Sequence, residues 1–317
     1  MTVILEDILA ARTRIRRYIH QTPLLQSQKL SEMLGCNLYI KAEYLQKVGA
    51  FKARGVMNYL LSDTSGAEIY STYSSGNHGQ ALAWGAASLK RKSIIFMPED
   101  ASPAKVAAVK GYGGEVRFAG VSSADRYNAC HAYAKEVDIH IVPPFDHNWI
   151  IAGQGTAMVE IIEELPEFDA ALVPCGGGGL LAGCSFVLNT LRGGKVPTYA
   201  CEPAMAADLQ EGLASGERKT IEFSPTIADG MRNLCVGDRN WEIIKECVPE
   251  GLACREETIV EAMRLYAIYL KNYVEPSGAA TLACLMENKE RFAGKTVVIV
   301  ASGGNIALKD YAKMVAS

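Results

Sequence analysis

Short runs of apolar residues alternate along the chain with longer segments in which apolar residues recur at helical spacing. The apolar runs predict β-strands at residues 38–42, 69–72, 93–97, 115–118, 139–142, 170–173, 198–201 and 296–300. The clearest helical segments between them cover residues 103–110, 124–136, 151–165, 180–191 and 257–271. This alternation indicates parallel sheets with helices on both faces, so the predicted fold class is α/β.

The length and net charge of the chain limit the number of domains and the kinds of partner to be expected. The chain has 317 residues, 49% of them hydrophobic, which suits one large or two medium domains. Its net charge of −3, with acidic and basic residues interspersed, argues against a nucleic-acid or membrane partner. No apolar run approaches the roughly 18 residues of a membrane-spanning helix. The first residues lack the basic and long apolar segments of a secretory signal.

The chain contains 9 cysteines, which are scattered and mostly lie inside apolar runs. No Cys-x-x-Cys pair or Cys/His metal spacing is present. Reduced, buried thiols in a cytoplasmic protein are therefore expected.

Candidate chemistry begins at Lys52, within the segment 49–55, Gly-Ala-Phe-Lys-Ala-Arg-Gly. A single lysine is typically a solvated surface charge. In small, apolar surroundings next to Phe51, however, desolvation would lower the pKa of its amine and make it available to form an imine. Taken alone, this segment does not distinguish the two interpretations.

A run of four glycines, Gly176, Gly177, Gly178 and Gly179, follows a predicted strand and precedes a predicted helix. Glycines let the backbone approach an anion closely, and the N–H groups at the helix start can hold a phosphate. A flexible turn is the structural alternative. A dinucleotide site is disfavoured, because neither the G-x-G-x-x-G spacing nor a downstream ribose-binding acid is clearly present.

Two further polar segments follow predicted strands. Residues 74–79, Ser-Ser-Gly-Asn-His-Gly, offer hydroxyls, an amide and backbone N–H groups at a helix start, which suit a carboxylate or a phenolic oxygen. Helix capping by Ser74 or Ser75 is the structural alternative. Residues 302–305, Ser-Gly-Gly-Asn, also read as an ordinary turn when taken alone.

Together these segments resemble the pyridoxal-phosphate enzymes of the threonine dehydratase and serine racemase family, over nearly the whole chain. The resemblance implies fold type II, similar to the tryptophan synthase β-subunit, with two open and mostly parallel sheets flanked by helices. It also implies a small domain, residues 69–145, inserted into a large domain formed by residues 1–68 and 146–317. Pyridoxal 5'-phosphate would lie between the domains, and a homodimer is expected.

The resemblance also implies roles for individual residues. Lys52 would be the Schiff-base lysine with Phe51 close to the ring, and Gly176, Gly177, Gly178 and Gly179 would hold the phosphate. The ring oxygen would contact Asn77, and the pyridine nitrogen would face Ser302. The substrate α-carboxylate would bind at Ser74, Ser75, Asn77 and His78, and Ser75 would be the acid-base group on the ring face opposite Lys52. Because the Ser302 hydroxyl is a neutral partner, it favours prompt loss of a β-leaving group over transamination.

Three acidic residues and one basic residue complete the expected site. Glu202, the carbonyl of Ala206 and Asp208 match the family's Mg²⁺ site, which would also take Ca²⁺ or Mn²⁺. Without that context, paired acids are more often capping or solvated groups. Arg126 matches an arginine of the serine-racemase-like members and could bind a second substrate carboxylate, although its alternative is a surface helical arginine. Glu275 would lie near the cofactor edge or be structural.

The predicted function is a β-elimination of a 3-hydroxy amino acid, 3-hydroxyaspartate or L-serine/L-threonine, that yields a 2-oxo acid and ammonia. The freed Lys52 amine would act as the general base. An amino-acid racemase on the same scaffold is the main alternative, since Ser75 is present. A non-catalytic phosphate or nucleotide binder is the alternative from another class, against which Lys52, Asn77 and Ser302 together argue.

Overall fold

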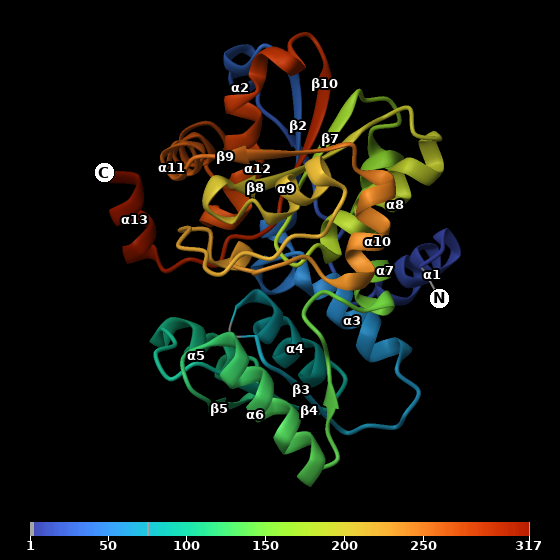
Figure 1. Ribbon diagram of the computed structural model, residues 1–317, viewed down its shortest axis with the longest axis vertical. Coiled ribbons are helices and arrows are strands. Elements are labelled where there is room, and N and C mark those ends of the chain that lie inside the picture. Colours follow the sequence, from blue (N-terminus) through green and yellow to red (C-terminus); the bar gives the residue numbers. More distant parts are fainter. Residues whose placement is uncertain (1–2, 75, 317) are drawn as a thin grey trace.

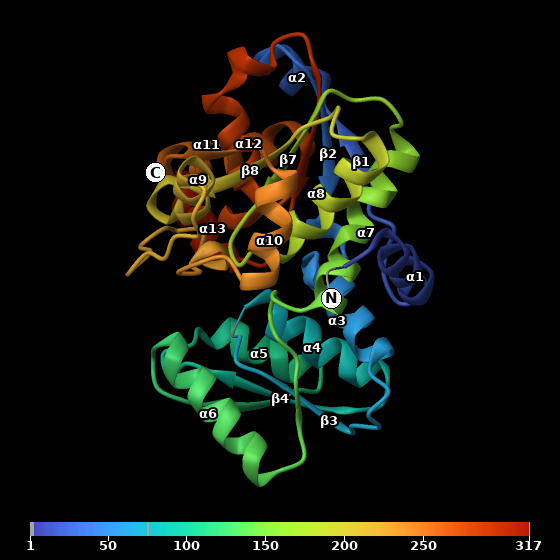
Figure 2. The same ribbon diagram turned by 45° about the vertical axis from the view of Figure 1, so that its right-hand side comes forward.

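The structure is a computed structural model that describes residues 3–74 and 76–316. Its strands form two separate sheets, one in each of two lobes (Figures 1 and 2). The larger sheet has the strand order β1-β2-β10-β7-β8-β9, and the smaller has the order β5-β4-β3-β6. Only the pairing of β1 with β2 is antiparallel among the described strands. The predicted α/β class with two mostly parallel sheets is confirmed.

The larger sheet consists of β1 (Leu24–Gln26), β2 (Asn37–Ala42), β7 (Ala170–Pro174), β8 (Thr198–Pro203), β9 (Glu250–Cys254) and β10 (Thr296–Ala301). The smaller sheet consists of β3 (Ile69–Thr72), β4 (Lys92–Met97), β5 (Glu115–Phe118) and β6 (His140–Ile141). All the strands expected from the apolar runs are present, with bounds within two residues of those predicted. The sequence pattern missed β1 and β9, which are edge strands of the larger sheet and are therefore less apolar than its centre.

The α-helices in the first half of the chain are α1 (Leu5–Ile15), α2 (Gln28–Leu34), α3 (Lys52–Ser62), α4 (Asn77–Ser88), α5 (Pro103–Gly111), α6 (Ser123–Glu136) and α7 (Asn148–Glu164). The later ones are α8 (Gly179–Arg192), α9 (Asp208–Ser215), α10 (Asp238–Cys247), α11 (Glu256–Leu265), α12 (Pro276–Glu287) and α13 (Leu308–Ala316). Short 3₁₀ turns are η1 (Glu43–Leu45), η2 (Lys47–Gly49), η3 (Ala204–Ala206), η4 (Asp229–Met231) and η6 (Lys289–Phe292). The helix predicted over residues 257–271 instead ends at Leu265 and continues as one π-helical turn, η5 (Tyr266–Leu270).

The larger sheet is buried on both faces because successive side chains of its central strand point to opposite sides. Val298 and Val300 of β10 pack into a cluster with α1, α7, α8 and α10, whereas Val297 and Ile299 pack into a second cluster with α2, α11, α12 and α13. In the smaller sheet, α4 and α5 cover one face and α6 covers the other. No helix within the described residues is both long and apolar enough to cross a bilayer.

The lobes meet where the strands end. Helix α3 packs against both α4 and α7, and α4 and α5 lie on the side of the smaller sheet that faces the larger lobe (Figure 2). Lys105 of α5 also forms an ion pair with Asp229 of η4, which joins the two lobes directly. The carboxyl ends of parallel strands are the usual place for a binding site in an open α/β fold. The exact domain bounds, 69–145 within 1–68 and 146–317, stay a prediction.

Candidate active site

Lys52 opens helix α3 and points its amine at the segment that joins the lobes. Lys52 Nζ donates a hydrogen bond of 2.7 Å to the carbonyl of Pro144 and lies 5.1 Å from the centre of the Phe51 ring. Burial lowers the pKa of this amine to about 8, because a charged ammonium loses its hydration there. A fraction of the Lys52 amine is therefore neutral near neutral pH.

The segment before Lys52 is hydrogen-bonded to the segment that follows β10. Ala50 and Gly303 form a β-bridge, Phe51 N–H donates to Ser302 O, and Gly304 N–H donates to Gly49 O. The buried Ser302 donates its hydroxyl hydrogen to Ser277 O over 3.3 Å. The structure thus brings Ser302 beside Lys52, although the two residues lie near opposite ends of the chain.

The polar loop after β3 leads into α4, whose first residue is Asn77. Asn77 Nδ2 donates to Glu275 Oε1 over 2.7 Å, and Asn77 Oδ1 accepts from Asn305 Nδ2 over 2.8 Å. A Cβ at Gly79 would overlap the carbonyl of Ser74, so the tight turn requires glycine. Ser75 lies outside the described residues, and its acid-base role stays a prediction.

His78 lies buried at the start of α4, where the positive charge of Lys52 affects the pKa of its ring. Its Nε2 donates to the carbonyl of Val142 over 3.1 Å, which makes Nδ1 the unprotonated nitrogen of the neutral ring. Burial and then the charge of Lys52 lower the His78 pKa to about 3. Its Nδ1 is buried and contacts no hydrogen-bond donor among the described residues.

The glycine run after β7 is a closely packed loop. A Cβ at Gly177 would overlap the ring of Phe145, and a Cβ at Gly178 would lie 2.8 Å from Val236. Gly178 has φ +91°, a conformation that favours glycine. The first N–H groups of α8, which begins at Gly179, have no partner within the helix. This geometry suits phosphate binding and disfavours the flexible-turn alternative.

The acidic residues expected to bind a cation lie at the end of β8. Glu202 is fully buried and accepts from the N–H groups of Leu209 and Gln210, at 3.2 and 2.8 Å. Burial and the charge of Asp208 raise the pKa of Glu202, and burial raises that of Asp208 to about 6. Ala206 lies buried between them in η3. Within residues 3–74 and 76–316, no group of three or more His, Cys, Asp or Glu side chains is arranged for a metal; the expected set contains two.

Arg126 lies in the first turn of α6 and is half-buried. Its guanidinium donates to the carbonyls of Tyr73 and Val121, each at 3.2 Å, and to the hydroxyl of Ser123 at 2.9 Å. Burial lowers its pKa. Since Tyr73 directly precedes the 74–79 loop, Arg126 lies next to the candidate carboxylate-binding segment, but its three nitrogens bond to neutral groups.

Sequence reasoning missed several residues that shape the site. Pro144 contacts Lys52, and Phe145 contacts the glycine loop. No sequence motif indicates either residue. Asn305 belongs to a motif that was identified, but its contact with Asn77 depends on the fold. Glu275, placed near the cofactor edge or in a structural role, is buried against Asn77, and burial followed by the charge of Asp229 raises its pKa to about 8.

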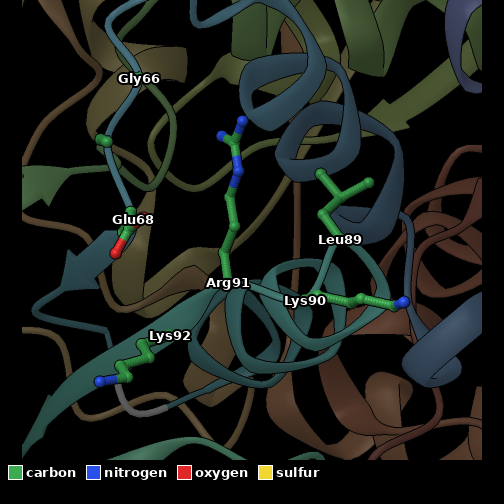
Figure 3. A pocket seen from close by; sticks show the side chains of 7 residues that line it. Gly66, Glu68, Leu89, Lys90, Arg91 and Lys92 are labelled. Carbon is green, nitrogen blue, oxygen red and sulfur yellow. The ribbon is translucent and has the colours of Figure 1, made fainter.

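A hollow of about 370 Å³ lies elsewhere, at the amino ends of β3 and β4 (Figure 3). Its rim includes Glu68, Lys90 and Lys92, and the two lysine side chains extend away from each other. Strands β3 and β4 run parallel, so this hollow is at the edge of the smaller sheet opposite to the 74–79 loop. It is therefore not part of the Lys52 site.

Comparison with known proteins agrees with this geometry. Residues 15–303 match the family model described as "Pyridoxal-phosphate dependent enzyme". The chain is 39% identical to the L-threo-3-hydroxyaspartate ammonia-lyase of Saccharomyces cerevisiae, over 98% of this chain and 95% of that protein. The crystal structure of serine racemase from Dictyostelium discoideum is 38% identical with a TM-score of 0.91, covering 97% of this chain and all (100%) of that one. The crystal structure of T.th. threonine deaminase is 37% identical with a TM-score of 0.89, covering 96% of this chain and 99% of that one.

Proposed function

The chain belongs to the family of pyridoxal-phosphate-dependent enzymes, and from this premise we propose that it is an ammonia-lyase that converts a 3-hydroxy amino acid to a 2-oxo acid and ammonia. The observation that carries the proposal is the partly buried Lys52 amine, held between Phe51 and the carbonyl of Pro144 with its pKa lowered to about 8. The preferred substrate is 3-hydroxyaspartate, with L-serine and L-threonine close behind.

Described residues can be assigned to each chemical group of the cofactor. The glycine loop and the N-terminus of α8 offer N–H groups for the phosphate. Asn77 Nδ2 bonds to Glu275 with one hydrogen and retains a second for the ring oxygen. The Ser302 hydroxyl is assigned to the ring nitrogen, and Phe51 lines the site beside Lys52.

Pyridoxal phosphate, when bound, supplies an electron sink that stabilises negative charge at the substrate α-carbon. Lys52 Nζ would be the base that removes the α-proton, and a pKa of about 8 suits this role near neutral pH. Ser74 and the N–H groups at the start of α4 hold the α-carboxylate, with help from the helix dipole. The His78 ring stays neutral near neutral pH.

Arg126 is proposed to distinguish a dicarboxylic substrate from serine and threonine. Its support is its position beside the carbonyl of Tyr73 and the 39% identity to an enzyme named for L-threo-3-hydroxyaspartate. To reach a distal carboxylate, the guanidinium must exchange hydrogen bonds with neutral groups for bidentate, charge-assisted ones, which are stronger.

Release of 2-oxo acid from L-serine, L-threonine and each 3-hydroxyaspartate isomer tests the function. Wild type is compared with Arg126→Ala and with Arg117→Ala, a control arginine of β5 that pairs with the exposed Glu115 and lies over the ring of Tyr133. We expect one 3-hydroxyaspartate isomer to be preferred, with the preference lost only in Arg126→Ala. Turnover of serine or threonine that is equal or better and insensitive to Arg126→Ala would leave a general serine/threonine dehydratase.

Racemisation is the second candidate, because relatives at 36% and 38% identity are named serine racemase. It requires an acid on the ring face opposite Lys52, the role predicted for Ser75. Formation of D-serine from L-serine in wild type, lost in Ser75→Ala while 2-oxo-acid release persists, would establish it. Release of oxo acid without D-serine would exclude it.

A divalent cation, Mg²⁺ first and Ca²⁺ or Mn²⁺ as alternatives, is proposed at Glu202, the Ala206 carbonyl and Asp208. Two neighbouring buried carboxyl groups, each with a raised pKa, are an electrostatic cost that a cation would remove. We expect Mg²⁺ to raise the melting temperature of wild type but not of Asp208→Asn. An equal rise in both proteins would place the cation elsewhere.

A homodimer, a cytoplasmic location and the domain bounds given above stay predictions that rest on the sequence and the family. Sedimentation equilibrium of the purified protein tests the dimer, and a monomer at micromolar concentration would contradict it.

A further inference from the structure

Val48, four residues before Lys52, has a backbone conformation that β-branched residues rarely adopt. Its φ is +55° and its side chain is buried, and the next residue, Gly49, has φ +68°. Lys90 and Lys271 are the other described non-glycine residues with positive φ, and neither is β-branched. A β-branched residue keeps such a conformation only when its surroundings hold it there, and such strain often marks a functional site.

The group that holds this turn is the side chain of Asn305. Asn305 Nδ2 donates a hydrogen bond of 2.6 Å to the carbonyl of Val48. A Cβ at Gly49 would come within 2.6 Å of Asn305 Oδ1, so the glycine makes room for this side chain. The Gly304 N–H adds a bond of 2.9 Å to Gly49 O. The strained turn is therefore built around Asn305.

The same Asn305 nitrogen also sets the orientation of Asn77. With its second hydrogen, Asn305 Nδ2 donates to Asn77 Oδ1 over 2.8 Å. The Asn77 nitrogen must then point the other way, where it donates to Glu275 Oε1. A reversed Asn77 amide would set two NH₂ groups against each other and its oxygen against a carboxyl oxygen.

We propose that Asn305 is a positioning residue for the cofactor: it fixes the Asn77 amide so that an N–H faces the ring oxygen of pyridoxal phosphate, and it couples this orientation to the strained turn before Lys52. The inference rests on the proposed function, since it assigns the second hydrogen of Asn77 to the cofactor. Asn305 acts indirectly, by holding the Asn77 side chain and the Val48 backbone in place.

Two near-isosteric variants separate positioning from simple stabilisation. Asn305→Asp replaces the donor by an acceptor and turns the Asn77 amide, whereas Asn305→Leu removes the contact without reversing it. The control is Asn288→Asp, which removes a 2.8 Å bond from Asn288 Nδ2 to the carbonyl of Cys284, at the end of α12 remote from Glu275. Each protein is prepared without cofactor. The melting temperature is measured on one sample, and another is titrated with pyridoxal phosphate while the visible spectrum is recorded.

The proposal predicts that Asn305→Asp weakens pyridoxal phosphate binding by roughly tenfold or more and shifts the visible band, because the ring oxygen loses a donor. Asn305→Leu should lie between Asn305→Asp and wild type, and Asn288→Asp should match wild type in both readouts. Affinity and spectrum unchanged in Asn305→Asp, or Asn305→Leu affected as much as Asn305→Asp, would overturn it. Failure of wild type to bind the cofactor would instead contradict the proposed function.

A second test removes the backbone strain at Val48. It can still be carried out if Asn305→Asp folds poorly. Val48→Gly accepts a positive φ without strain, so the loss of melting temperature caused by Asn305→Leu should be smaller in the Val48→Gly background. Equal losses in the two backgrounds would show that Asn305 does not hold the turn.

Discussion

At the residue scale, burial controls the ionisation of the side chains around Lys52. Desolvation lowers the pKa of Lys52 to about 8 and, together with the Lys52 charge, that of His78 to about 3. It raises the pKa of Glu275 to about 8. Near neutral pH the histidine and most of the glutamate are therefore neutral, so a bound anionic cofactor or substrate meets few competing negative charges.

The raised pKa of Glu275 predicts a pH-dependent stability. Between about pH 4.5 and about pH 8 the folded protein holds a proton on Glu275 that the unfolded chain releases, so this residue's contribution to the free energy of unfolding falls as pH rises. The total change is at most a few kcal/mol, since one pKa unit corresponds to about 1.4 kcal/mol. Glu275→Gln keeps the neutral form, and its unfolding free energy should depend less on pH.

Urea unfolding of the cofactor-free protein at about pH 6 and about pH 8.5 measures this difference. Asp229→Asn is the informative companion variant, because the Asp229 charge contributes to the raised pKa. Asp229→Asn should lower the pH at which the Glu275 contribution to the free energy of unfolding is lost. Parallel pH profiles for wild type and Glu275→Gln would show that Glu275 is ionised throughout.

Single residues were predictable from the sequence where their type and neighbours limit their chemistry. Lys52 needed the resemblance to a family to stand out, because its segment alone fits two interpretations, but the four glycines fall in this group. Pro144 and Asn305 do not, because a backbone carbonyl has no sequence signature and an asparagine acquires its role from partners far away in the chain. The contacts of Lys52 with Pro144 and of Asn305 with Val48 span 92 and 257 residues.

At the scale of elements, the site is assembled from strand ends. The loop of residues 176–179 follows β7, Ser302 follows β10, and the 74–79 loop follows β3. The apolar runs predicted these strands because buried parallel strands are nearly continuous in apolar residues. A helix start was expected at residues 74–79, where α4 begins, but α3 was not singled out, since it begins in a glycine-rich segment that weakens helical periodicity.

The packing of the glycine loop predicts that added methyl groups impair cofactor binding. In Gly177→Ala the new Cβ overlaps Phe145, and in Gly178→Ala it combines φ +91° with a 2.8 Å approach to Val236. Such strain costs about 1–3 kcal/mol, so the affinity for pyridoxal phosphate should fall by roughly 5- to 150-fold. Equilibrium titration of the cofactor-free variants measures the change.

Gly111→Ala is the matched control for the glycine variants. Nothing lies within 4 Å of the Cβ that this change would add at the end of α5, so the affinity for the cofactor should equal that of wild type. A stability equal to or slightly above that of wild type is expected, because alanine favours helix more than glycine does. Wild-type affinity in Gly177→Ala and Gly178→Ala would show that the loop does not hold the phosphate.

At the scale of the whole molecule, a buried ionic network fixes α3 relative to the larger sheet. Arg54, two residues after Lys52, bonds to Glu43 and Glu160 at 2.7 Å each, and Lys41 bonds to Glu160 at 2.7 Å. The four side chains are buried, and their charges balance. They join α3 to β2 and to α7, the helix that follows the Pro144 carbonyl. The network thus stabilises the arrangement that presents Lys52.

Removal of one member of this network should be costly. Arg54→Met leaves the buried carboxylate of Glu43 without its bonded cation and Glu160 with Lys41 alone, and we expect a loss of about 3–5 kcal/mol in the free energy of unfolding. Arg255→Met breaks the exposed pair with Glu287 and should cost less than about 1 kcal/mol. Urea unfolding at two salt concentrations compares them. Similar small losses in both variants would mean that water reaches the network.

The strand order of the whole molecule could not be predicted from periodicity. Strand β10 comes last in the chain yet lies between β2 and β7, where it pairs with both. Apolar patterning identifies buried strands but gives no neighbour relations, so the meeting of Ser302 with Lys52 required the fold. The two-lobed arrangement was expected from the family resemblance, since no composition change marks the smaller lobe.

Lys52 is expected to bind pyridoxal phosphate covalently, and reduction with borohydride tests for this bond. Reduction of the purified holoenzyme makes the bond to the lysine permanent, and mass spectrometry of its peptides then locates the pyridoxyl group. The account predicts one modified site, Lys52, and none in Lys52→Ala. Modification of a different lysine, or an unchanged yield of labelled protein in Lys52→Ala, would contradict it.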